Sequence, residues 1–214
     1  MTDSEGRTPG NHYLATDESS KKLPIFEKIG YGVGDAASNL YFQTFMMWIT
    51  IYYTDVFGIS AAAMGWMFLL TRIWDAVNDP IMGMIADRTE SRWGKFRPYI
   101  IIMAPLLGLC GVVTFFTPDL GVGAKLIYAY ITYTLLTMLY TAVNVPYSAL
   151  MGVMTPNSHE RTGASQYRFV LAFGGQLIVS GATLPLVAYF GRGNTQIGWT
   201  WTMGVFGLIA VILF

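Results

Sequence analysis

The amino-acid sequence predicts an all-α membrane protein with six transmembrane helices, and three observations support this. Of the 214 residues, 53% are hydrophobic. Only 12% are charged, which is about half the share found in most soluble domains. Six apolar segments also reach the length of roughly 20 residues that a helix needs to cross a bilayer.

The six predicted helices cover approximately residues 29–53, 60–86, 98–117, 125–153, 164–190 and 198–214. Residues 1–27 are polar and lack the short apolar core of a signal peptide, so we expect a cytoplasmic tail there. The last helix is still apolar at Phe214 and has no polar flank. We therefore expect residues 28–214 to form one six-helix transmembrane bundle that is truncated at its C-terminus.

The distribution of Lys and Arg predicts the orientation in the membrane. With a cytoplasmic amino terminus, nine of the 13 Lys and Arg residues fall on the cytoplasmic side, and only Lys125 and Arg192 fall outside. Cytoplasmic loops of membrane proteins carry such an excess of positive residues. The expected location is a multi-pass position in the inner or plasma membrane.

Composition excludes several classes of function. A formal net charge of zero gives no electrostatic basis for binding nucleic acid. The single cysteine, Cys110, excludes an intrachain disulfide and any multi-cysteine metal site. The two histidines, His12 and His159, lie in polar segments and do not indicate a zinc site. No cofactor is expected.

Arg72, Asp75 and Asp79 stand within the second predicted span, in the run TRIWDAVNDPIMGMIADR at residues 71–88. Residues three or four apart lie on one helix face, so these charges form a single stripe. On insertion scales each such charge costs about 2.5–3.5 kcal/mol at the bilayer centre. The stripe is therefore expected to face the interior of the bundle or a water-filled cavity.

Two interpretations of the stripe remain open. Arg72 and Asp75 could form a structural ion pair, although one arginine neutralises only one carboxylate and Asp79 would remain. Alternatively, Asp75 and Asp79, with Asn78 beside them, form a site of hard oxygen ligands that binds Na⁺ or exchanges a proton.

Further polar residues lie at helical spacing inside the other spans. They are Asp35 and Asn39 in the first span, Tyr140, Thr141, Asn144 and Ser148 in the fourth, and Arg168 in the fifth. Polar faces on four spans indicate a shared aqueous cavity. The third and sixth spans have almost no polar side chains and are expected to be peripheral.

Several runs of residues, in this order along the chain, resemble one transporter family. They are KIGYGVGD, YYTDVFG, RIWDAVNDPIMG, DRTESRWGKFRP, NVPYSAL and ERTGASQYR. Over about residues 28–214 the sequence is similar to the amino-terminal half of a glycoside–pentoside–hexuronide:cation symporter, the melibiose-permease branch of the major facilitator superfamily.

The resemblance implies a twelve-helix transporter that couples sugar uptake to Na⁺, Li⁺ or H⁺ by alternating access. This chain would supply one major-facilitator-type bundle, and a missing C-terminal bundle or a second copy would complete the cavity. The cation-site positions of the family match Asp75, Asn78, Asp79 and Thr141. The gating loop of the family corresponds to a segment that contains Gly83, Asp87, Arg88, Arg92, Lys95 and Arg97.

The sugar-site positions of the family match less well. The resemblance implies substrate contacts from Asp35, Asn39, Tyr140, Asn144, Ser148 and Arg168. Asn39 and Asn144 stand where melibiose permeases have carboxylates, and Ser38 and Ser148 replace a Lys and a Trp. We therefore expect a glycoside, pentoside or hexuronide other than melibiose, and the loss of acidic groups favours an acidic sugar beside Arg168.

Two alternatives differ in function. A lipid-type symporter or flippase could use the same fold. An intramembrane aspartyl protease is the other, because Gly32, Gly34 and Asp35 fit a Gly-x-Gly-Asp motif. Such proteases need two aspartates that share a proton, and no second motif of that type is present in this sequence. We therefore expect no enzyme.

Overall fold

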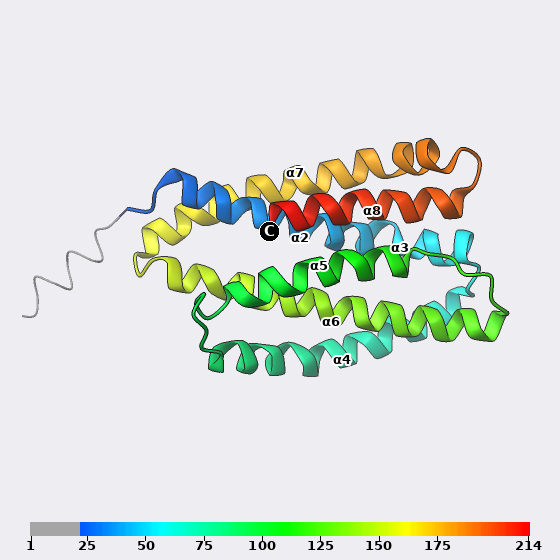
Figure 1. Ribbon diagram of the computed structural model, residues 1–214, viewed down its shortest axis with the longest axis horizontal. Helices are drawn as coiled ribbons and strands as arrows, with labels where there is room; N and C mark the ends of the chain where they lie inside the picture. The colour runs from blue at the N-terminus through cyan, green and yellow to red at the C-terminus, as the bar shows by residue number, and fades with distance from the viewer. Residues whose placement is uncertain (1–21) are drawn as a thin grey trace, which may run out of the picture.

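The computed structural model describes residues 22–214, which form helices joined by short loops, with no strand in this range (Figure 1). The first predicted span is α2 (Ile25–Met47), which continues through α3 (Ile49–Ile51) into the π-helix η1 (Tyr52–Phe57). The other five are α4 (Ala61–Arg88), α5 (Arg97–Thr114), α6 (Val122–Met154), α7 (Ser158–Gly191) and α8 (Thr195–Leu213). The all-α prediction is confirmed, and residues 1–21 of the expected tail lie outside the described part.

Local sequence explains several helix ends. Ser60 caps α4, because its Oγ accepts a hydrogen bond from the backbone N–H of Ala63 at 3.3 Å. Asn194 caps α8 in the same way, accepting from the N–H of Ile197 at 3.2 Å. The first span ends at Gly58, whose φ of 84° lies in the left-handed region that glycine adopts without strain.

The helices run roughly along the long axis of the molecule (Figure 1). Helix α2 packs along α7, α8 lies against α2, α5 and α7, and α4 packs mainly against α6. Among residues 22–214, the helices long and apolar enough to cross a membrane are α5, α6, α7 and α8. The two remaining long helices, α2 and α4, are the ones that carry the intramembrane acidic residues.

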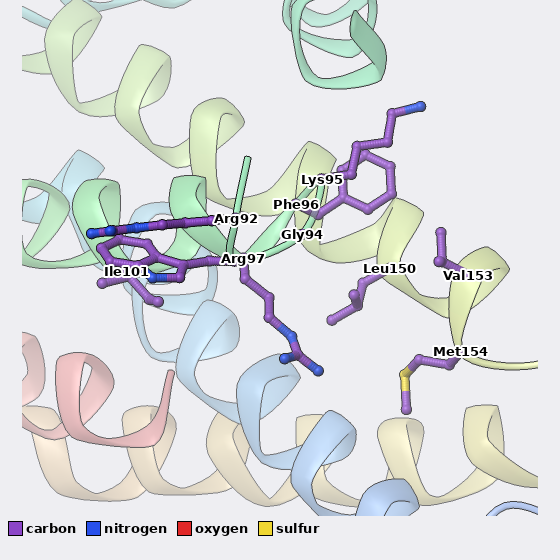
Figure 2. A pocket seen from close by; sticks show the side chains of 10 residues that line it. Arg92, Gly94, Lys95, Phe96, Arg97, Ile101, Leu150, Val153 and Met154 are labelled. Atoms are coloured by element: carbon purple, nitrogen blue, oxygen red, sulfur yellow. The ribbon is translucent and has the colours of Figure 1, made fainter. Parts of the chain in front are cut away.

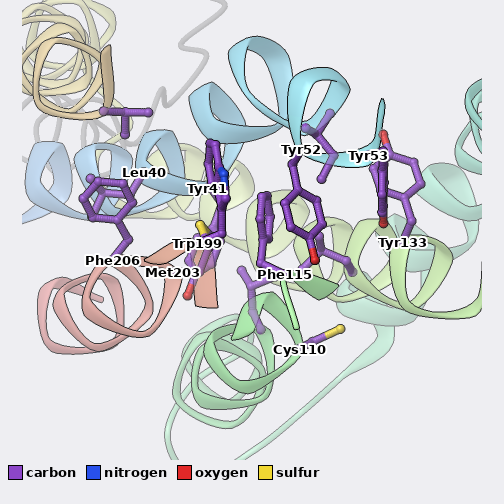
Figure 3. Packing of buried hydrophobic residues seen from close by; sticks show 14 of the residues in the cluster. Leu40, Tyr41, Tyr52, Tyr53, Cys110, Phe115, Tyr133, Trp199, Met203 and Phe206 are labelled. Carbon is purple, nitrogen blue, oxygen red and sulfur yellow. The ribbon is translucent and has the colours of Figure 1, made fainter. Parts of the chain in front are cut away.

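Buried aromatic side chains form the core at the end of the bundle where η1 lies (Figure 3). The ring of Phe115 lies 4.6 Å from that of Tyr52 and 5.7 Å from that of Trp199. Trp199 and Phe206 of α8 are each only 1% exposed. The sixth span buries these large side chains against α2, α5 and α7.

Small residues allow α2 and α7 to approach closely. A Cβ at Gly175 would lie 2.9 Å from the carbonyl oxygen of Ala36, and one at Gly32 would lie 3.0 Å from that of Tyr167. Real Cβ atoms do not approach backbone oxygens at 2.9 Å. The two helices therefore need glycine at these positions to reach this distance.

Gly175→Ala is expected to push α2 and α7 apart and to lower the free energy of unfolding by about 1–3 kcal/mol. Gly174→Ala is the matched control, because a Cβ there meets nothing within 4 Å. Thermal unfolding of both variants in detergent would measure the difference. Equal melting temperatures would contradict the close-packing interpretation.

Candidate functional site

A cavity of about 140 Å³ lies between α2, α4 and α6 and gathers several of the predicted site residues. Its wall includes Asp75 and Asp79 of α4 and Tyr140, Thr141 and Asn144 of α6. Apolar side chains of α2 line the opposite wall. They are Phe42, Phe45 and Met46. The cavity thus brings both intramembrane aspartates of α4 next to hydroxyl and amide groups of a second helix.

The two aspartates differ in their partners. The hydroxyl of Thr141 donates a hydrogen bond of 2.9 Å to Oδ1 of Asp79. Oδ1 of Asp75 is buried and has no hydrogen-bond partner among the described residues. A buried oxygen of this kind is costly unless something binds to it. Asp75 therefore presents an acceptor to the cavity that the protein itself does not satisfy.

Arg72 does not lock Asp75 in place. Its Nη1 lies 3.9 Å from Oδ2 of Asp75, beyond hydrogen-bond distance, and its side chain is 65% exposed. An exposed, loose pair of this kind adds little stability. The contact leaves the second oxygen of Asp75 available, which favours the interpretation of the stripe as an ion site.

Asn78 does not lie on the cavity wall. It is half-buried and next to Asp79 in the chain, but successive residues of a helix point about 100° apart. Its place in the predicted cation site therefore stays a prediction.

A second polar group lies between α2 and α7. Nε of Arg168 lies 3.0 Å from Oδ1 of Asp35, and the side chain of Asp35 is only 9% exposed. The guanidinium also lies 6.0 Å from the rings of Tyr31 and Tyr147, which stack at 4.8 Å. The hydroxyl of Tyr147 donates a hydrogen bond to the backbone carbonyl of Tyr31. The two aromatic side chains therefore restrict the movement of the ion pair.

Gln176 extends this group and was not predicted from the sequence. Its Nε2 donates a 3.1 Å hydrogen bond to Oδ1 of Asn39, and Nδ2 of Asn39 donates at 2.8 Å to the carbonyl of Asp35. Gln176 lies eight residues after Arg168, close to two helical turns, so both side chains share a face of α7. This periodicity is the signal that could have identified it.

The predicted substrate residues therefore fall into two groups. Asp35, Asn39 and Arg168 meet between α2 and α7, whereas Tyr140 and Asn144 lie in the cavity beside α4. Ser148 is exposed and forms no side-chain hydrogen bond within residues 22–214. The single shared cavity expected from the sequence is thus two neighbouring polar regions, because α4 and α7 lie on different sides of α2 and α6. As expected, α5 and α8 contribute no side chain to the wall of the acidic cavity.

The charged side chains of the predicted gating loop form weak, exposed contacts. Nζ of Lys95 lies 3.2 Å from Oδ1 of Asp87, and both side chains are exposed. The guanidinium of Arg92 stacks on the ring of Trp93 at 5.3 Å. Arg88 is exposed, and a Cβ at Gly83 would lie 4.0 Å from Cγ1 of Val145 on α6. Weak, exposed contacts of this type are suited to a segment that changes partners.

At the same end of the bundle, a tighter ion pair links α2 to the start of α7. Nζ of Lys28 lies 2.7 Å from Oε2 of Glu160, which also accepts the N–H of Leu23 at 3.1 Å. The hydrogen bond from Lys28 lowers the pKa of Glu160 below its usual value. The carboxylate therefore stays charged at neutral pH and holds the beginning of α2 against α7.

Comparison with known proteins places the chain in a transporter family. Residues 30–214 match the family described as MFS/sugar transport protein. The chain is 47% identical over 192 residues to the putative glycoside/cation symporter YagG of Escherichia coli, covering 90% of this chain and 42% of that protein. It is 39% identical over 194 residues to the isoprimeverose transporter of Lactiplantibacillus pentosus, covering 90% of this chain and 40% of that protein.

A third relative is the glucuronide carrier protein homolog of Escherichia coli, 42% identical over 141 residues that cover 64% of this chain and 31% of that protein. The chain spans 42% of the length of the first of these curated relatives.

The comparisons also decide between a transporter and an enzyme. The matching family and these relatives are transporters. The structure pairs Asp35 with an arginine, whereas an aspartyl protease needs a second aspartate there. The resemblance inferred from the motifs is confirmed: the chain belongs to the MFS/sugar transport protein family.

Proposed function

We propose that this chain forms one six-helix bundle of a symporter that couples the uptake of a sugar or glycoside to Na⁺ or H⁺. The single observation that carries the proposal is the acidic cavity between α4 and α6. It holds one carboxylate bonded to Thr141 and one, on Asp75, whose buried Oδ1 has no partner in the described chain.

The two carboxylates are better explained as a binding site for a small cation than as a fixed structural contact. Carboxylate and hydroxyl oxygens are the ligands that hard cations prefer, and a proton could instead neutralise one carboxylate. Binding of either ion would remove negative charge from the interior of the bundle. The cation would thereby favour closure around the sugar, and by linkage the sugar would raise the affinity for the cation to the same extent.

The group around Arg168 is the proposed sugar site. Because Asp35 already balances the charge of Arg168 at 3.0 Å, an acidic sugar would compete with a buried carboxylate. A neutral glycoside instead offers hydroxyls, each of which can donate to Asp35 and accept from Arg168. We therefore favour a neutral glycoside or pentoside over the acidic sugar expected from the sequence. The name of the isoprimeverose relative supports this choice, whereas that of the glucuronide carrier homolog favours an acidic sugar.

We further propose that the amino terminus is cytoplasmic and that the protein lies in the inner membrane. The basic residues of the 87–97 loop lie at the same end of the bundle as Lys28 and Arg161, as positive residues on the cytoplasmic side should. A second bundle would complete the transport cavity, either as further helices of the same polypeptide or as a second copy of this chain.

The test is uptake into proteoliposomes of the chain alone and of the chain joined to the carboxyl-terminal helices of the 47% identical relative. Radiolabelled glycosides and pentosides would be offered with an inward Na⁺ gradient at fixed pH, and separately with a proton gradient. We expect one gradient to drive accumulation. Binding of sugar without any response to either ion would contradict coupled transport, and lipid movement in place of sugar would identify a flippase.

Gln176→Leu is expected to raise the sugar concentration needed for half-maximal uptake severalfold with a smaller effect on the maximal rate. The variant removes the hydrogen bond that orients Asn39 but leaves the acidic cavity intact. Gln166→Leu, at an exposed position nearer the start of α7, is the matched control. An equal change in both variants would show that Gln176 does not act at the sugar site.

A further inference from the structure

A further cavity lies outside both polar groups, at the end of the bundle where α5 begins and α6 ends (Figure 2). Its volume is about 940 Å³. Loop residues 92–97 form one wall, and the first turns of α5 and the last turns of α6 form the other. The proposed transport mechanism makes no use of this cavity.

The loop side of the cavity is positively charged. Arg92, Lys95 and Arg97 line it, and none of its lining residues is acidic. Arg97 forms no ion pair or side-chain hydrogen bond with any residue between 22 and 214, and Figure 2 shows its side chain extended into the space below the loop. Lys95 is paired with Asp87, whereas Arg92 and Arg97 have no ion-pair partner within residues 22–214, so positive charge at this site is not balanced.

The loop is held in a defined shape. Oγ of Ser91 donates to the carbonyl of Gly94 at 3.0 Å and accepts from the N–H of Trp93 at 3.1 Å. The N–H of Gly94 also donates to the carbonyl of Ser91 at 3.0 Å, and Gly94 has a φ of 95°. This closed turn fixes the backbone from which the three cations extend.

The opposite side of the cavity is apolar and open. Ile101 is 58% exposed and Val153 is 68% exposed, and Leu150 and Met154 lie beside them. Trp93, 49% exposed, stands at the rim. Tryptophan is enriched at the level of lipid headgroups, where a ring with one polar edge lies between water and hydrocarbon.

We propose that this cavity binds an anionic phospholipid of the cytoplasmic leaflet. The phosphate would bind at Arg97, with Arg92 and Lys95 adding positive charge on the same loop, and an acyl chain would run along Ile101 and Val153. A lipid matches both walls, whereas a soluble phosphate would leave the apolar wall uncovered. Basic pockets between helices on the cytoplasmic side of membrane proteins bind such headgroups. The assignment to this leaflet depends on the proposed orientation, but it does not depend on which sugar or ion is transported.

The experiment is native mass spectrometry of the 214-residue chain in detergent, titrated with phosphatidylglycerol or with phosphatidylcholine of the same acyl chains. We expect retained phosphatidylglycerol and little phosphatidylcholine. Arg97→Gln should weaken retention about fivefold, the effect of removing one surface cation. Arg88→Gln is the matched control, because it removes the same charge from the same loop but does not line the cavity.

Each outcome decides the proposal. Equal losses in the two variants would show general attraction of anionic lipid to a basic surface and would overturn a specific site. Equal retention of both lipids would exclude recognition of charge. Displacement of phosphatidylglycerol by millimolar inorganic phosphate would identify a soluble anion as the ligand. Since the readout is lipid retention, it can succeed or fail independently of coupled sugar uptake.

Discussion

Replacing Asp79 by Asn is expected to abolish the dependence of sugar uptake on the coupling ion. The change removes one of the two carboxylates from the acidic cavity but keeps the size of the side chain and an oxygen near the hydroxyl of Thr141. Coupling between two ligands commonly changes affinity by about 5- to 150-fold. The apparent sugar affinity of the variant should therefore stay at its ion-free value when the ion is added.

The measurement is sugar binding with and without Na⁺ at fixed pH, and across pH without Na⁺. Asp55→Asn is the matched control, because Asp55 is exposed at the other end of the bundle and bonds only to Thr54. Thr141→Ala should give an intermediate loss, since it keeps both carboxylates and removes one ligand. If Asp79→Asn responds to the ion as the unaltered chain does, Asp79 is not part of the coupling site.

Neutralising one member of the Asp35–Arg168 pair is expected to destabilise the bundle strongly. The pair is close, with 3.0 Å between Nε and Oδ1, and the carboxylate is nearly enclosed. Removal of one partner leaves a buried charge without compensation, which typically costs about 3–5 kcal/mol. Asp35→Asn and Arg168→Gln should each unfold at a clearly lower temperature in detergent.

The double variant Asp35→Asn with Arg168→Gln separates stability from function. Replacing both charges removes the uncompensated charge, so most of the melting temperature should return. Sugar binding should not return, because the amides lack the paired charges that orient the hydroxyls. Recovery of both properties in the double variant would assign the pair a structural role alone. Arg161→Gln, at an exposed position on α7, controls for a general effect of removing an arginine from this helix.

The helices could be predicted from the sequence because their signal is local. Long apolar segments and their polar ends set the six spans within a few residues, as a comparison of the predicted 125–153 with α6 (Val122–Met154) shows. The intramembrane charges were equally evident, since each one is costly in lipid and stands out from its neighbours. The family followed from motifs that lie in the same order along the chain.

The partners of these charges were not predictable in the same way. Helical spacing places Arg72 on the stripe of Asp75, but it does not show that the two charged groups are 3.9 Å apart or that the arginine side chain is exposed. It also gave no reason to connect Gln176 with Asn39, which is 137 residues away in the chain. Contacts of this kind depend on which helices lie side by side, and the sequence of a single helix does not specify its neighbours.

The sequence by itself determined that this protein is a helical membrane bundle with two acidic groups in α4 that must face away from lipid. These properties follow from the free-energy cost of placing charge in hydrocarbon. That cost can be judged from the residues of a single segment. Only the tertiary structure decided that α4 faces α6 while Arg168 faces Asp35, and that the loop before α5, the start of α5 and the end of α6 line a basic cavity. These arrangements depend on packing between helices that are far apart in the chain. Close contacts at glycine, such as that of Gly175 with Ala36, determine which helix surfaces can pack together.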